Sequence, residues 1–183
     1  MKSKLIASLI LINLAFTYTF CSNNCREEIN LIKNLEDEYS TINLHESNVS
    51  KKEAHPNTLA WRALVNDSIL SEPNILCKNL NRIDAIGETL TVTIYKNGLK
   101  KQVGANTNRF MYSGTFRTYN GLKNGFTKSE VTAKLGTPTL RSTKQWVYPA
   151  DDNYSSIFFY FNAQNTLYLI IYTEPEEGYN DEE

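Results

Sequence analysis

The sequence predicts an α+β protein in which a short helix packs on an antiparallel three-stranded meander, preceded by a β-hairpin region and two N-terminal helices. Three observations support this prediction: a capped helix motif ends at Gly136, alternating strands follow from 145 to 172, and apolar residues recur at helical spacing after residue 25. The predicted segments are a signal peptide at 1–21, a helical segment at 22–75, a hairpin region at 76–117, an α+β domain at 118–173 and a disordered acidic tail at 174–183.

The first 21 residues have the pattern of a secretory signal peptide. Lys2 and Lys4 precede an apolar run from Leu5 to Phe16, which falls short of the ~20 residues that a membrane-spanning helix needs. Two fates of Cys21 stay open: signal peptidase cleaves after it, or it is lipidated and anchors the chain. We expect an exported protein, in the periplasm or at the outer membrane, that touches a membrane only through such an anchor.

Either fate leaves Cys25 and Cys77 as a pair. In an oxidising compartment an even pair is most simply a disulfide, and a metal site or a catalytic thiol is the alternative. The bond would close a loop of about 50 residues, which the chain-entropy model values at roughly 4 kcal/mol. His45 and His55, the two histidines of the chain, lie in the polar stretch 40–57. We predict a structural disulfide, no metal and no cofactor.

The charge distribution argues against a nucleic-acid partner. The formal net charge is −1, and such a balance does not attract a polyanion. The acids gather at the C-terminus, where no base separates Glu174, Glu176, Glu177, Asp181, Glu182 and Glu183. A segment of this composition is expected to be solvated and disordered.

The N-terminal segment predicts two helices. Apolar residues from Ile29 to Tyr39 recur at helical spacing. A second helix is expected between Pro56 and Leu70, with a buried face formed by Trp61, Leu64, Val65 and Ile69. Pro73 ends it, because the residue before a proline avoids the α region.

Residues 88–117 predict β-structure. Leu90, Val92 and Ile94 alternate with polar residues, which is typical of a half-buried strand. Asn97-Gly98 favours a left-handed two-residue turn, after which Leu99 to Val103 returns as the partner strand. A further strand is expected from Phe110 to Phe116.

The segment from 122 to 138 contains a complete set of helix boundary signals. Thr127-Lys128-Ser129-Glu130 forms a capping box, and Phe126 with Val131 forms a hydrophobic staple around it. Gly136 and Pro138 then stop the helix after two turns. So short a helix is unstable alone, so it must pack on neighbouring structure.

Three strands are predicted to supply that structure, at 145–148, 156–161 and 167–172. The face that carries Ile157, Phe159 and Phe161 should hold the helix. The opposite face is aromatic and is the candidate partner-binding surface, formed by Tyr160, Tyr168, Tyr172, Phe158 and Ile170. The alternative is that residues 88–117 cover this face, which would make it part of the core.

The same stretch resembles the BamE (SmpA/OmlA) type of envelope domain. The resemblance rests on Gly125-Phe126-Thr127, Glu130-Val131, Leu135-Gly136 and Pro138, followed by Trp146-x-Tyr148 and two strand-like runs. It covers about 50 residues, and the β-lactamase inhibitory proteins contain domains of similar shape. The resemblance implies a helix-and-three-strand domain without a catalytic centre, in a lipoprotein that supports outer-membrane β-barrel assembly.

No sequence motif of an enzyme is present. The chain lacks Gly-x-Ser-x-Gly, His-Glu-x-x-His and a phosphate-binding loop. We therefore expect a non-catalytic exported protein that binds another envelope or secreted protein, in outer-membrane protein assembly or envelope maintenance. The alternative is a secreted or periplasmic inhibitor or immunity-type protein that binds an enzyme.

Overall fold

The computed structural model describes residues 24–36, 59–105, 108–150 and 155–174. The chain divides into two compact units, 1–42 and 43–183. The predictions for the signal peptide, Cys21, the two histidines and the acidic tail beyond residue 174 lie outside the described residues.

The described part of the first unit is a helix over residues 24–36. Cys25, Ile32 and Leu35 are buried and recur at helical spacing, as the sequence predicts for the first N-terminal helix. Cys25 is disulfide-bonded to Cys77, which confirms the predicted pairing.

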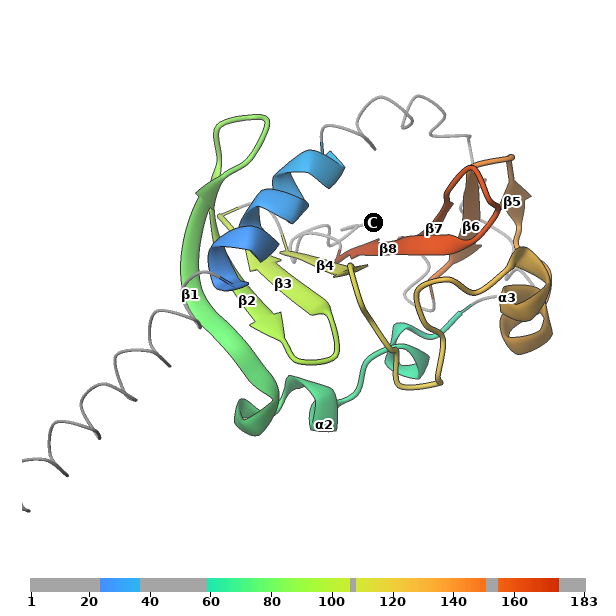
Figure 1. Ribbon diagram of the computed structural model, residues 1–183, viewed down its shortest axis with the longest axis horizontal. Coiled ribbons are helices and arrows are strands. Elements are labelled where there is room, and N and C mark those ends of the chain that lie inside the picture. Colours follow the sequence, from blue (N-terminus) through green and yellow to red (C-terminus); the bar gives the residue numbers. More distant parts are fainter. Residues whose placement is uncertain (1–23, 37–58, 106–107, 151–154, 175–183) are drawn as a thin grey trace, which may run out of the picture. The chain divides into compact units, whose positions relative to one another are not determined.

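The second unit is built on one eight-stranded antiparallel sheet, with strand order β1-β2-β3-β4-β8-β7-β6-β5 (Figure 1). The predicted α+β fold class, a helix on a three-stranded meander behind two N-terminal helices, is therefore wrong. The strands are β1 (Ile75–Ile83), β2 (Thr89–Tyr95), β3 (Leu99–Val103), β4 (Asn108–Ser113), β5 (Leu140–Arg141), β6 (Gln145–Pro149), β7 (Ser156–Phe161) and β8 (Leu167–Thr173).

The sheet consists of two four-stranded meanders joined at β4 and β8. The predicted strands at 145–148, 156–161 and 167–172 are present as β6, β7 and β8. The sheet extends beyond this meander, because β8 also pairs with β4, at Phe110–Tyr172 and Tyr112–Ile170. The hairpin region and the C-terminal strands therefore share one sheet.

The β2–β3 hairpin is confirmed, but its turn differs from the prediction. The Gly98 amide donates to the Tyr95 carbonyl at 3.0 Å, and Gly98 has a φ of +84° while Asn97 does not have a positive φ. The turn therefore holds one left-handed residue instead of two. A Cβ at Gly98 would lie 2.5 Å from the Thr115 carbonyl oxygen, so the position requires glycine.

The second predicted N-terminal helix is replaced by three short turns. These are the 3-10 helix η1 (Trp61–Ala63), the single helical turn α2 (Asp67–Leu70) and the 3-10 helix η2 (Glu72–Asn74). Asn66 interrupts the segment because its side chain caps α2 by accepting from the Ile69 amide. Leu59 meanwhile forms a parallel bridge with Ala150, which draws the chain along the sheet instead of into a helix.

Helix α3 (Lys128–Leu135) has the boundaries that its sequence motif predicts. Glu130 donates its amide to the Thr127 hydroxyl at 3.3 Å, and its carboxylate accepts from the Thr127 amide at 2.7 Å. The Glu130 carboxylate accepts from the Thr127 amide and from the Thr127 hydroxyl, and these two hydrogen bonds hold the pKa of Glu130 below its usual value, with a smaller contribution from Lys123. The capping box is thus confirmed in both of its parts.

One face of the sheet is covered by the segments that precede β1 and that connect β4 to β5. Trp61, Leu64, Phe116, Leu122 and Val131 from these segments join strand residues in a single buried cluster. Phe116, predicted as strand, lies in the connection because β4 ends at Ser113. We call these covering segments the cover. Two buried tyrosines hold the cover on the sheet: Tyr112 donates to the Leu64 carbonyl, and Tyr148 donates to the Gly136 carbonyl, both at 2.8 Å.

Replacing Thr127 by Ala should lower the free energy of unfolding by about 1 kcal/mol, because the Glu130 amide loses its capping acceptor. Chemical denaturation measures the change. Thr127→Ser keeps the hydroxyl and is the matched control, so it should unfold close to wild type. Equal stability of all three proteins would show that the cap contributes nothing.

Tyr148 should make stability fall at alkaline pH. Burial raises the pKa of its phenol from 10.0 to about 12. Its contribution is therefore complete below pH 10 and is lost as the pH rises through about 12, since the unfolded chain ionises first. Denaturation curves between these limits should show a shallower loss for Tyr148→Phe than for wild type, and parallel losses would contradict the shift.

Candidate protein-binding surface

The five residues of the predicted aromatic surface do not share one face. Phe158 pairs with Ile171 and Tyr160 with Leu169, whereas Tyr172 pairs with Ile157 and Ile170 with Phe159. Paired residues point to the same side of a sheet, so Tyr172 and Ile170 lie opposite Phe158 and Tyr160. The register shift between Tyr160 and Phe161 interrupts the pairing next to Tyr168.

Burial also separates these residues from the surface. Tyr160, Tyr172 and Ile170 are buried, and Phe158 and Tyr168 are partly buried. The Tyr172 ring stacks on Trp61 at a centroid distance of 4.6 Å. The alternative prediction, that residues 88–117 cover the row, does not hold for β2, β3 and β4, because these strands lie in the same sheet as β8. Phe116, in the link after β4, does join the buried cluster that contains Ile170 and Tyr172. The predicted aromatic row is thus divided between two faces and largely enclosed.

The exposed part of the sheet lies on β1, β2 and β3, where the cover ends. Along β2 the residues on the covered face pass from buried Tyr95 through partly buried Thr93 to exposed Thr91 and Thr89. Along β3 they pass from buried Leu99 to exposed Val103. The pairs Asn81–Thr91, Thr91–Val103 and Ile83–Thr89 place the exposed residues on the same face. We call Asn81, Ile83, Thr89, Thr91 and Val103 the open face.

Two apolar side chains, Ile83 and Val103, lie on the open face, and a third, Ile86, lies in the turn at its end. Ile83 is 69% exposed and Val103 41% exposed, and Ile86, in the β1–β2 turn, is 85% exposed. Isolated exposed apolar residues are ordinary in soluble proteins, but a group of them marks a surface suited to a protein partner. The threonines and Asn81 between them can offer hydrogen bonds without the cost of burying a charge.

The β1–β2 turn holds Ile86 outward through hydrogen bonds that do not involve its side chain. The Asp84 carboxylate accepts from the Ile86 amide at 3.0 Å and from the Glu88 amide at 2.9 Å. The Gly87 amide donates to the Asp84 carbonyl at 3.2 Å, and Gly87 has a φ of +87°. The turn is therefore ordered by its own hydrogen bonds, so that a protein binding there would order fewer residues and lose less conformational entropy.

The outer edge of β1 is less suitable for a partner than the open face. Its pairing with β2 is irregular between Ile75 and Cys77 and again between Cys77 and Leu80. Asn79 in the same stretch has a φ of +57°. Irregular edges of this kind discourage the addition of a further strand.

The buried polar side chains on the other face of the sheet have a structural role. Arg82 donates to the Gln102 side-chain oxygen at 2.6 Å, and the Lys100 ammonium donates to the Ser113 carbonyl at 2.8 Å. Both cations are buried. Within the four described ranges, no group of three His, Cys, Asp or Glu side chains could hold a metal ion.

No helix of the described residues combines the length and apolar content needed to cross a membrane. Comparison with protein-family models, with curated proteins and with solved structures finds no match to the chain. The surface must therefore be interpreted from its own chemistry.

Sequence reasoning missed Ile83, Ile86 and Val103. One signal was available, because Asp84-Ala85-Ile86-Gly87-Glu88 places an isoleucine inside a turn, where polar residues are usual. Ile83 and Val103 gave no comparable signal. The alternation along each strand shows which residues share a face, but it does not show where the cover ends.

Replacing Asp84 by Ala should loosen the β1–β2 turn, because the Ile86 and Glu88 amides lose their acceptor. Those two amides should exchange hydrogen about fivefold faster than in wild type. Asp84→Asn keeps the acceptor oxygen and should exchange at close to the wild-type rate. Unchanged exchange in the Ala variant would show that the backbone alone holds the turn.

Proposed function

We propose that this protein is a non-catalytic, exported protein of the cell envelope that binds another protein through the open face. The observation that carries this proposal is the exposure of Ile83 and Val103 on one face, with Ile86 projecting from the adjoining turn. Burying these side chains against a partner would remove apolar surface from water at about 25 cal/mol per Å². The hydrogen-bonded turn and the neighbouring threonines and Asn81 favour a specific contact.

The resemblance to BamE-type domains supports a role in outer-membrane protein assembly or envelope maintenance. The residues that carry it form α3 and strands β6 to β8, within a larger sheet than the resemblance implies. The second candidate is a secreted or periplasmic inhibitor or immunity-type protein, which the rigid open face also suits. The two differ in the partner and in the fate of Cys21.

The test is site-specific photo-crosslinking in the cell that produces the protein. A photoreactive residue in place of Ile83 or Ile86 should give one discrete adduct with another protein. The same residue at exposed Thr137, which follows the C-cap of α3, is the control and should give none. Adducts of equal yield at all three positions, or none at any, would remove the open face as a binding surface.

The adduct and the mature N-terminus together separate the two roles. An outer-membrane assembly protein in the adduct and a diacylated Cys21 would support the envelope role. A soluble enzyme in the adduct and a free Ser22 would support the inhibitor role. Mass spectrometry identifies both the crosslinked partner and the N-terminal residue.

A further inference from the structure

The segment that connects β4 to β6 carries an unbalanced positive charge. Between Gly114 and Gln145 the basic residues are Arg117, Lys123, Lys128, Lys134, Arg141 and Lys144, and the only acid is Glu130. That carboxylate is held in the capping box by the Thr127 amide and hydroxyl. One carboxylate balances at most one of these six positive charges.

Three of these cations gather around one loop. Arg117 and Lys123 face each other across an antiparallel bridge, an arrangement that is unfavourable for like charges. The Lys134 ammonium donates to the Asn120 carbonyl at 3.2 Å, at the tip of the same loop. None of the three forms an ion pair with a described residue. We call Arg117, Lys123 and Lys134 the cationic cluster.

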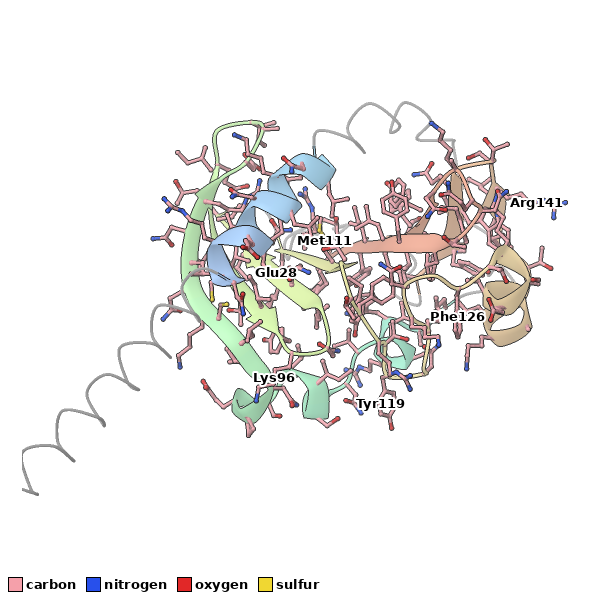
Figure 2. The ribbon with its side chains drawn as sticks, in the orientation of Figure 1. Glu28, Lys96, Met111, Tyr119, Phe126 and Arg141 are labelled. Atoms are coloured by element: carbon pink, nitrogen blue, oxygen red, sulfur yellow. The ribbon has the colours of Figure 1, made fainter. Side chains whose placement is uncertain are left out.

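The loop between these cations is rigid and presents a tyrosine. The Tyr119 amide donates to the Leu64 carbonyl at 2.8 Å, and the Asn120 amide donates to the Ala63 carbonyl at 3.1 Å. The Thr118 hydroxyl accepts from the Leu122 amide at 2.9 Å, which closes the loop. Tyr119 is nevertheless 60% exposed, and Figure 2 shows its side chain pointing outward.

We propose that the cationic cluster and Tyr119 bind an acidic segment of a protein partner. Arg and Tyr are enriched at the energetic centres of protein interfaces, and a bound carboxylate would relieve the repulsion between Arg117 and Lys123. The loop needs no ordering on binding, since its backbone is already hydrogen-bonded. Three cations around one loop suit a short run of Asp or Glu better than a nucleic acid, which engages more phosphates and would meet a chain of net charge −1.

This proposal takes from the proposed function only that the partner is a protein, and its surface is separate from the open face. The probe is a fluorescein-labelled peptide of fifteen glutamates, titrated with the exported protein at low salt. Fluorescence anisotropy should show binding that weakens as salt rises. The double variant Arg117→Gln/Lys123→Gln should bind about tenfold more weakly, and Tyr119→Ala should also bind more weakly.

The matched control is Lys78→Gln/Lys96→Gln, which removes two charges from β1 and the β2–β3 turn. It should bind the peptide as wild type does. The melting temperature of the Arg117→Gln/Lys123→Gln variant should be unchanged or slightly higher, which separates a binding loss from unfolding. The variant Ile83→Glu should leave peptide binding unchanged, so that failure of the open face and failure of this proposal are distinguishable.

Three outcomes would overturn the proposal. The wild-type protein does not bind the peptide; the two double variants bind it equally; or a single-stranded DNA of fifteen nucleotides binds more tightly than the peptide. The last result would assign the cationic cluster to nucleic acid.

Discussion

The pairing of β4 with β8 is the constraint on which the rest of the second unit depends. It joins residues about sixty positions apart in the chain and converts two meanders into one sheet. Phe110, Tyr112, Ile170 and Tyr172 meet across this joint, and Trp61 packs on them from the cover, with ring centroids 5.6 Å from Phe110 and 4.6 Å from Tyr172. Without the joint, neither meander would have a wide enough face to hold segments 59–74 and 114–139.

Local parts of this architecture could be predicted because short-range chemistry determines them. The capping box of α3 involves residues three apart, and the β2–β3 hairpin involves strands separated by one turn. Each depends only on interactions between residues that are close together in the sequence. The C-terminal strands could be predicted for the same reason, because their alternating residues and polar turns lie within about thirty residues of chain.

The errors concern contacts that the local pattern does not specify. Alternation assigns each residue a face relative to its own strand, but a shift of one position against the neighbour reverses the assignment. The predicted aromatic surface assumed that Phe158 and Tyr160 share a face with Ile170 and Tyr172. The observed register of β7 and β8 places the two pairs on opposite faces. The segment before β1 was predicted as one helix because its apolar spacing allows it. The structure instead divides it, since Leu59 bridges to Ala150 and Asn66 caps a new turn.

The open face follows from the connectivity of the sheet. The two covering segments are residues 59–74 and the link from β4 to β5, and both lie over the end of the sheet that carries Tyr95 and Leu99. The β1–β2 and β3–β4 connections at the other end span only residues 84–88 and 104–107, too few to fold back over the strands. Among the residues that the structure describes, these connections therefore leave the face uncovered, but they do not require apolar residues there. Threonine or lysine would satisfy the same strand positions, as Thr89 and Thr91 show, so the fold alone does not require Ile83 and Val103 to be apolar.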